Sequence, residues 1–163
     1  LLFSTASDKI MTMDSCIFCK IVKGDAPSHV IWEDEKHLAF LSIFPNTPGF
    51  SVVVTKKHYS SYVFDLSDDV YAELLSAAKT VGKKIDAALP DVGRTGLLAE
   101  GFGVDHAHVK LFPMHGTADM DTWKPIEFRR TDFYEIYPGY LSSHDAGRAD
   151  DGELAELAKK IRD

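Results

Sequence analysis

The sequence predicts an α+β domain in which a five-stranded antiparallel sheet carries one long and one short helix. Three observations support this prediction: strand-like segments before residue 56, an apolar stripe of helical period between Ser67 and Pro90, and further strand-like segments after it. The chain has 163 residues, 45% of them hydrophobic, which is enough for one core and short for two domains.

The first half predicts a short helix followed by three strands. Residues 16–22 form the helix, which ends before Gly24. Residues 30–33 and 37–41 are strands paired around a polar turn, and the β-branched segment 50–55 is the third strand. Consecutive strands joined in this way form an antiparallel meander.

The second half predicts the long helix and two more strands. The helix begins near Ser67, where the two following aspartates complement its dipole. Its apolar stripe consists of Val70, Leu74, Ala77, Ala78, Val81 and Ile85. Pro90 ends the helix, residues 93–96 form a loop, and the strands are 97–99 and 104–113, the second ending at Pro113.

The chain is expected to divide into three parts. Residues 1–14 form an N-terminal extension, disordered or foreign to the natural protein, and residues 15–114 form the domain. Residues 115–163 form an aromatic-rich extension that ends in a short charged helix from Glu153 to Ile161. Its aromatic side chains cover either their own domain or a contact between subunits.

Composition excludes several classes of protein. A net charge of -7 argues against a general nucleic-acid scaffold but leaves room for a pocket that takes one nucleotide. No segment approaches the roughly 18 apolar residues of a membrane span, and the N-terminus lacks the pattern of a secretory signal. A cytoplasmic protein without membrane or extended nucleic-acid partners is expected.

Polar residues alternate with apolar ones in the last predicted strand. His106, His108 and Lys110 share one face, with about 7 Å between neighbours, so two or three of them can engage one polyanionic ligand. The alternative is a structural strand whose polar face meets solvent.

The only two cysteines are Cys16 and Cys19. This spacing suits a redox disulfide, half of a metal site, or two small buried hydrophobic residues. In the same segment, Ile17, Phe18 and Ile21 form an apolar stripe that serves either the core or a wall for a planar ligand.

Four motifs follow one another along the chain: Cys-Ile-Phe-Cys-Lys-Ile at 16–21, Phe-Leu-Ser-Ile-Phe-Pro-Asn-Thr-Pro-Gly at 40–49, Lys-Lys-His at 56–58 and His-Ala-His-Val-Lys-Leu-Phe-Pro at 106–113. In these motifs and their order, the chain resembles the histidine triad (HIT) family of nucleotide hydrolases and transferases. The resemblance implies a HIT-like fold over residues 15–114. It also implies that His108 attacks the α-phosphorus of a nucleotide and forms a covalent nucleotidyl-histidine, with His106 and Lys110 as the other triad positions.

The resemblance further implies ligands and partners. Cys16, Cys19, His58 and His106 match a structural zinc site of some family members. The cleft for a purine nucleotide or nucleotide conjugate is matched by Ile17, Phe18, Ile21, Phe40 and Ile43, with Ser42 at a ribose-contacting position. Family members commonly pair as homodimers with a continuous sheet.

The chain departs from the family pattern at several positions. Lys110 stands where relatives have histidine or glutamine, the loop 100–103 is short and lacks a serine, and Ser42 and Phe50 replace an aspartate and a histidine. Hydrolysis and nucleotidyl transfer, on a phosphoramidate or a dinucleoside polyphosphate, therefore both stay open. One alternative is a nucleotide-binding or adaptor protein with the HIT fold and weak or no catalysis. Another is a thiol redox protein that uses Cys16 and Cys19.

Overall fold

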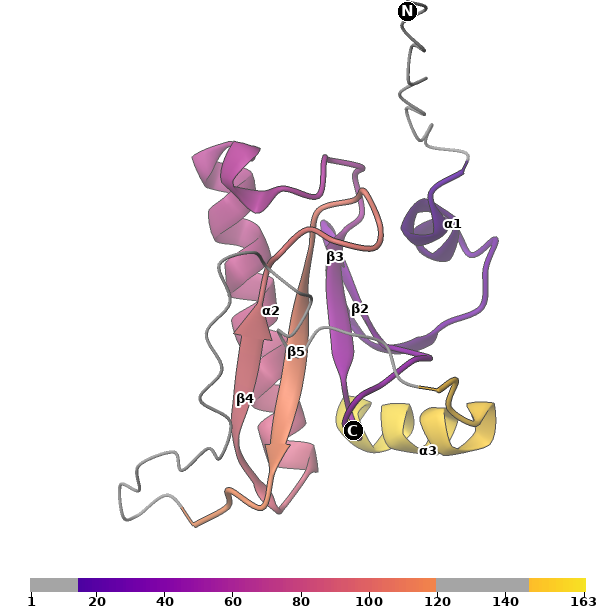
Figure 1. Ribbon diagram of the computed structural model, residues 1–163, viewed down its shortest axis with the longest axis vertical. Helices are drawn as coiled ribbons and strands as arrows, with labels where there is room; N and C mark the ends of the chain where they lie inside the picture. Colours follow the sequence, from indigo (N-terminus) through magenta and orange to yellow (C-terminus); the bar gives the residue numbers. More distant parts are fainter. Residues whose placement is uncertain (1–14, 120–146) are drawn as a thin grey trace, which may run out of the picture.

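The computed structural model describes residues 15–119 and 147–163 as a sheet with helices on both faces (Figure 1). The strands are β1 (His29–Glu33), β2 (His37–Leu41), β3 (Ser51–Thr55), β4 (Val92–Leu98) and β5 (His108–His115). The α-helices are α1 (Ile17–Lys23), α2 (Asp68–Ala88) and α3 (Asp151–Arg162), and one 3₁₀ turn, η1, spans Val63–Asp65. The predicted N-terminal extension and the segment 120–146, with all of the tail's Phe, Trp and Tyr residues, lie outside the described residues.

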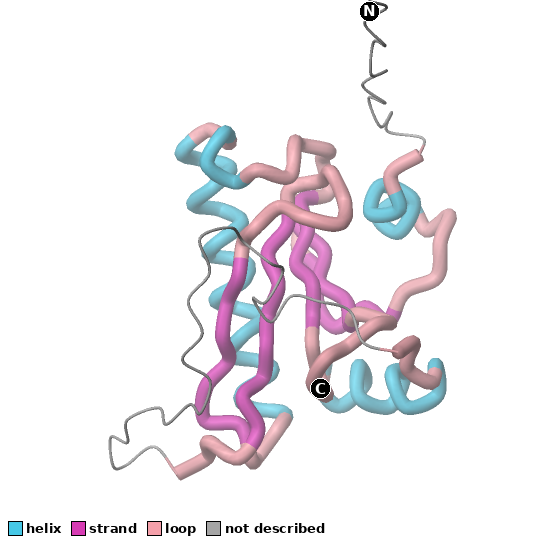
Figure 2. The backbone as a smooth tube through the Cα atoms, in the orientation of Figure 1, coloured by secondary structure: helices cyan, strands magenta, loops and turns pink. Residues whose placement is uncertain are grey.

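The five strands form one antiparallel sheet in the order β1-β2-β3-β5-β4, which confirms the predicted fold class. Only β4 breaks the sequence order, because the chain leaves β3, crosses the sheet through α2 and returns to the far edge (Figure 2). β5 thus becomes a central strand, which places its residues in the middle of the sheet.

Side-chain alternation along the strands separates two cores. One face of β2 and β3 packs against α1, through Leu38, Phe40, Val52 and Val54. The opposite face packs against α2 and α3, and it includes Ala39, Leu41, Val53, Val109 and Leu111. Because Val54 pairs with His108 and Val52 with Lys110, the two polar residues of β5 lie on the α1 face.

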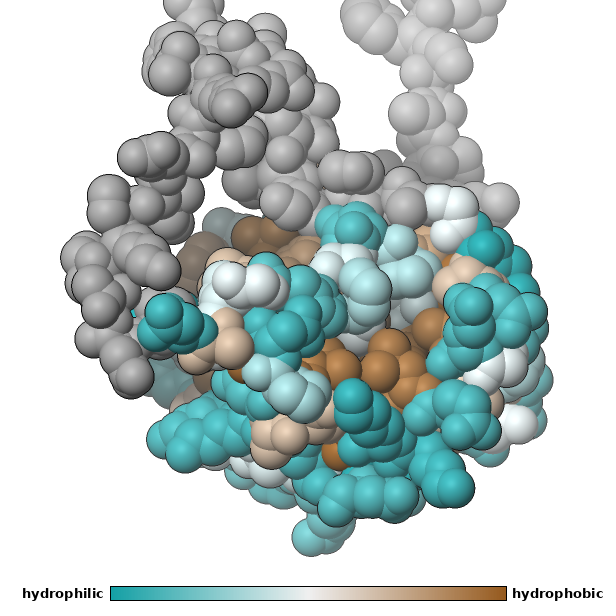
Figure 3. Space-filling view, turned by 90° about the horizontal axis from the view of Figure 1, so that it is seen from below, coloured by the Kyte–Doolittle hydropathy of each residue, from teal (hydrophilic) through white to brown (hydrophobic). Residues whose placement is uncertain are grey.

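Helix α2 buries five of the six residues of the predicted stripe, Leu74, Ala77, Ala78, Val81 and Ile85, while Val70 at its start is half-buried. Helix α3 adds Leu154, Ala158 and Ile161 to the same core and begins at Asp150, whose carboxylate accepts from the backbone N–H groups of residues 152 and 153. Seen from below, the surface is mainly hydrophilic around a smaller hydrophobic patch (Figure 3). The C-terminal helix therefore packs on the domain, while the domain boundaries themselves stay a prediction.

Two strand predictions were wrong at their ends. Residues 93–96 belong to β4 and not to a loop, because backbone pairing with β5 outweighs the glycines in an edge strand that is irregular between Val92 and Thr95. β5 begins at His108, because Ala107 donates its N–H to Tyr59 and residues 104–106 form bends. It also continues past Pro113.

The strand accepts Pro113 for a physical reason. β3 pairs with β5 only as far as Leu111, so at Pro113 the strand has a single neighbour and the missing N–H costs no bond to β3. In the described residues, no helix combines the length and apolar character that crossing a bilayer requires.

Candidate functional site

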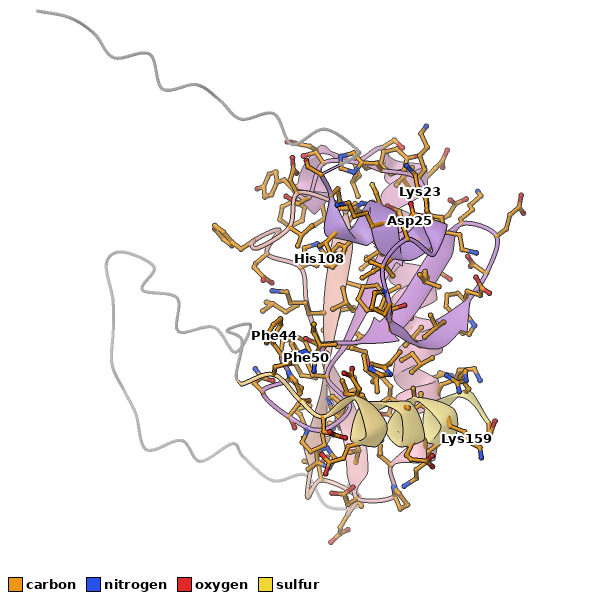
Figure 4. All side chains as sticks on the ribbon, turned by 90° about the vertical axis from the view of Figure 1, so that its right-hand side faces the viewer. Lys23, Asp25, Phe44, Phe50, His108 and Lys159 are labelled. Carbon is orange, nitrogen blue, oxygen red and sulfur yellow. The ribbon has the colours of Figure 1, made fainter. Side chains whose placement is uncertain are left out.

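A cleft of about 400 Å³ opens on the α1 face of the sheet. Its floor is formed by β2, β3 and β5, one wall by α1, and the other wall by the loop that leads into β5. His108 lies on this side of the sheet together with Phe44 and Phe50, as the side chains in Figure 4 show. The cleft lining is mostly apolar, as in many small-molecule sites.

Beside the cleft, Cys16, Cys19, His58 and His106 bring their ligand atoms within 4.8 Å of one another. The Cys19 Sγ lies 3.3 Å from the His58 Nδ1 and 3.5 Å from the His106 Nδ1, and the two Nδ1 atoms are 3.2 Å apart. The Cys16 Sγ is 3.5 Å from the His106 Nδ1. Cys16 and Cys19 come from the N-terminal turn of α1, His58 from the segment after β3 and His106 from the segment before β5.

These separations can be compared with those of a tetrahedral metal site. Bond lengths of about 2.3 Å to sulfur and about 2.0–2.1 Å to nitrogen place sulfur and nitrogen ligands about 3.5 Å apart and two nitrogens about 3.4 Å apart. The observed distances between the ligand atoms, 3.2–3.5 Å, agree with this geometry. The His106 Nε2 lies 2.7 Å from the Thr55 carbonyl oxygen and donates to it, which leaves the Nδ1 free to ligate. The four predicted ligands thus form a group that could hold a metal ion.

His108 lies at the start of β5 with its side chain held by two contacts. Its Nδ1 lies 2.7 Å from the carbonyl oxygen of His106, which can only accept, so the Nδ1 carries the proton. The ring of Phe18 packs edge-on against it with centroids 5.3 Å apart. The Nε2 has no hydrogen-bond partner among the described residues. Burial lowers the pKa of His108, an effect that the bond to His106 opposes and the charge of Lys110 reinforces. The imidazole is therefore neutral at pH 7, with its free lone pair on Nε2.

Lys110 lies next to His108 on the same face and lines the cleft. Its ammonium forms an ion pair with Glu100, and both side chains are largely buried, with 14% and 7% of their surface exposed. The other carboxylate oxygen of Glu100, Oε2, is buried without a hydrogen-bond partner among the described residues.

The structure brings all of the predicted substrate-contacting residues into one place. The cleft is lined by all six of them: Ile17, Phe18, Ile21, Phe40, Ser42 and Ile43. His106 is fully buried, and its ring faces the cysteines while its backbone carbonyl holds His108. His106 precedes β5, so the prediction was wrong in placing it within the strand, but its ring lies on the α1 side and, like that of His108, packs edge-on against Phe18. Their roles in binding and catalysis stay predictions.

Sequence reasoning missed Glu100 and Thr55 as parts of the site. Glu100 could have been found from the register, because Leu98 pairs with Lys110 and extending the ladder by two residues sets Glu100 opposite His108. Thr55 acts through its backbone, which no side-chain pattern reveals.

Comparison with known proteins decides the family. Residues 23–117 match the HIT domain family model. The chain belongs to the HIT family. An HIT-like protein of Methanocaldococcus jannaschii is 35% identical over 128 residues, which cover 74% of this chain and 95% of that protein. An adenosine 5′-monophosphoramidase of Schizosaccharomyces pombe is 41% identical over 100 residues, which cover 61% of this chain and 74% of that protein.

Solved structures show the same HIT fold. A histidine triad nucleotide-binding protein from Sulfolobus tokodaii is 27% identical with a TM-score of 0.66, and the match covers 90% of this chain and 89% of that one. A zinc-bound histidine triad family protein from Mycobacterium smegmatis is 23% identical with a TM-score of 0.64, and the match covers 93% of each chain. At that identity the likeness concerns the fold alone.

Proposed function

We propose that this HIT protein is a nucleotide hydrolase or nucleotidyl transferase that acts at the α-phosphate of a purine nucleotide conjugate, with His108 as the nucleophile. The observation that carries the proposal is the hydrogen bond from the His108 Nδ1 to the His106 carbonyl, which leaves Nε2 as the free lone pair beside the cleft. The activity of the adenosine 5′-monophosphoramidases of Schizosaccharomyces pombe and Candida albicans, both similar to this chain, supports the same reaction class.

The reaction proceeds in two displacements. The Nε2 lone pair of His108 forms a bond to the α-phosphorus, and the bond from phosphorus to the leaving group breaks with its electron pair going to the leaving group, which takes up a proton from solvent. Water then attacks the phosphorus, the P–Nε2 bond breaks with its pair returning to nitrogen, and the water proton is released. In a transferase, a second nucleophile replaces the water. The ammonium of Lys110 stabilises charge on the nonbridging oxygens.

The nucleoside lies on the α1 side of the cleft in this proposal. Phe18 and Phe40 pack edge-to-face with ring centroids 5.6 Å apart and, with the neighbouring isoleucines, give an apolar wall for a base. Purine preference comes from the resemblance and the similar monophosphoramidases, because an apolar wall holds any base. Ser42 contacts the ribose.

The metal in the Cys₂His₂ group is structural zinc. Two thiolates and two imidazoles form a donor set that zinc prefers over hard cations such as Mg²⁺. When bound, zinc supplies a cross-link between α1, the segment after β3 and the segment before β5. His106 in turn holds His108, because the His108 ring donates a hydrogen bond to the backbone carbonyl of His106.

The experiment that tests the function is capture of the intermediate. The protein is mixed with adenosine 5′-phosphoramidate, or with diadenosine triphosphate, quenched rapidly, and digested for mass spectrometry. A nucleotidyl adduct on the peptide that contains His108, absent from His108→Ala, is the expected result. Turnover that survives in His108→Ala would overturn the assignment.

A nucleotide-binding or adaptor protein with weak or no catalysis is the second candidate, and one observation favours it. The charge of Lys110, the one Lys or Arg that lines the cleft among the described residues, is offset by Glu100, which weakens transition-state stabilisation. This candidate predicts that wild type and His108→Ala bind a purine nucleotide with the same affinity, as measured by calorimetry. It also predicts that neither protein turns over either conjugate.

A homodimer is part of the proposal. β4 is an edge strand of the sheet, and Leu97 on it is 47% exposed, so this edge suits pairing with a second copy. Sedimentation velocity should give twice the chain mass of 18.1 kDa. A monomer at micromolar concentration would contradict this expectation.

A further inference from the structure

Glu100 lies on the side of the cleft opposite the base-binding wall. The strands lie in the order β2, β3, β5 and β4 across this part of the sheet. Phe40 is on β2, His108 is on β5, and Glu100 follows the end of β4. With a base against Phe40 and the α-phosphate at His108, the part of the substrate beyond the phosphate therefore extends toward the β4 side, where Glu100 and the ammonium group that it pairs with lie.

The loop that carries Glu100 is held firmly by its neighbours. Gly101 adopts φ +72°, and a Cβ atom there would lie 2.9 Å from the Ser61 carbonyl oxygen, so the backbones are in close contact. Asp105 accepts a hydrogen bond of 2.9 Å from the Ser61 N–H, and Ala107 donates one of 2.9 Å to Tyr59. The carboxylate of Glu100 is thus fixed beside the cleft.

We infer that Glu100 is a specificity-determining residue that, through its ion pair with Lys110, selects nucleotide conjugates whose leaving side carries no negative charge. The inference rests on the proposed function and narrows it to conjugates such as phosphoramidates, in preference to dinucleoside polyphosphates. Glu100 acts through Lys110 and through its own charge, without contacting the reacting atoms.

Charge balance at this end of the cleft carries the inference. One Lys110 N–H is used by Glu100, and the remaining two can bind one anionic α-phosphate. A further phosphate would have to share the Lys110 ammonium with the α-phosphate. It would also approach the buried carboxylate of Glu100, whose Oε2 has no hydrogen-bond donor among the described residues to offset its charge. At about 7 Å and an effective dielectric constant of about 20, one extra like charge weakens binding by about tenfold or more.

Glu100→Gln tests this directly, because it removes the charge and keeps the shape. The measurement is kcat/KM for adenosine 5′-phosphoramidate and for diadenosine triphosphate, expressed as a ratio. We expect wild type to prefer the phosphoramidate and Glu100→Gln to shift the ratio toward the triphosphate by at least about tenfold. Glu73→Gln, which alters an exposed ion pair between Glu73 on α2 and Lys36 in the turn between β1 and β2, is the matched control and should leave the ratio unchanged.

The outcomes separate the inference from the proposed function. If wild type cleaves a conjugate but the ratio in Glu100→Gln stays within about twofold of wild type, the inference is overturned and the function stands. If wild type cleaves neither conjugate, the proposed function fails.

Binding to the wild-type protein gives a second test that needs neither turnover nor a folded variant. Calorimetry with AMP and ADP compares one phosphate with two. The inference predicts that ADP binds at least about tenfold more weakly than AMP. ADP binding as tightly as AMP, or more tightly, would overturn it.

Discussion

Replacing His58 by glutamine should weaken zinc binding and lower the stability of the protein. The His58 Nδ1 lies 3.3 Å from the Cys19 Sγ and 3.2 Å from the His106 Nδ1, so the substitution deletes one of four ligands. Second-shell changes alone cost roughly 10–100-fold in metal affinity, so loss of a direct ligand should cost about 100-fold or more.

The expected magnitude follows from mass action. Free zinc at about 1,000 times its Kd stabilises a folded protein by about 4.1 kcal/mol, and a site about 100-fold weaker leaves about 1.4 kcal/mol. The difference, about 2.7 kcal/mol, corresponds to a fall in Tm of about 5–10 °C for a chain of this size.

Calorimetry and elemental analysis on protein purified without chelator measure both effects. His29→Gln is the control, because His29 lies outside the metal group and pairs with Asp151 on α3. It should keep one zinc per chain, whereas His58→Gln should keep less zinc after transfer to zinc-free buffer and, with free zinc restored, should melt about 5–10 °C below wild type. A wild-type protein without zinc, whose Tm is unaffected by chelator, would refute the reasoning.

Two further predictions concern stability. Leu154→Ala should lower the free energy of unfolding by about 2–4 kcal/mol in urea denaturation, because Leu154 is 5% exposed in the core. Met114→Ala should change it by less than about 1 kcal/mol, because Met114 is 41% exposed, and equal effects of the two substitutions would show that α3 is not packed on the core. The hydrogen bond to the Pro48 carbonyl, followed by that to Asp91, raises the pKa of His115 above its usual value of 6.5. The charged His115 therefore stabilises the folded protein fully below pH 6.5, and this stabilisation is lost as the pH rises through the raised pKa. His115→Gln should therefore destabilise the protein more at pH 5.5 than at pH 8.5, and the reverse order would contradict this.

The regular parts of the fold could be predicted because local patterns and tertiary packing agree. The stripe on α2 has helical period and is buried as expected, and alternation along β5 correctly placed His108 and Lys110 on one face. β4 was shortened in the prediction because its two glycines are typical of loops, and only pairing with β5 makes them a strand.

The site was predictable where family motifs carry it and not where the backbone does. The four metal ligands come from segments far apart in the sequence, and no spacing rule unites them without the resemblance to the HIT family. The partner of Lys110 was missed, because an isolated glutamate after a strand is usually solvated. The carbonyl groups of Thr55 and His106, which set the two imidazole tautomers, leave no trace in residue type.

The most direct test of the central claim is the mass of the His108 peptide after rapid quenching with adenosine 5′-phosphoramidate. The account predicts an increase corresponding to one adenylyl group, located on His108 and discharged when the reaction is left to proceed. The account would be contradicted if the substrate turned over without this adduct in a time series that resolves the first turnover. An adduct on another residue would contradict it as well.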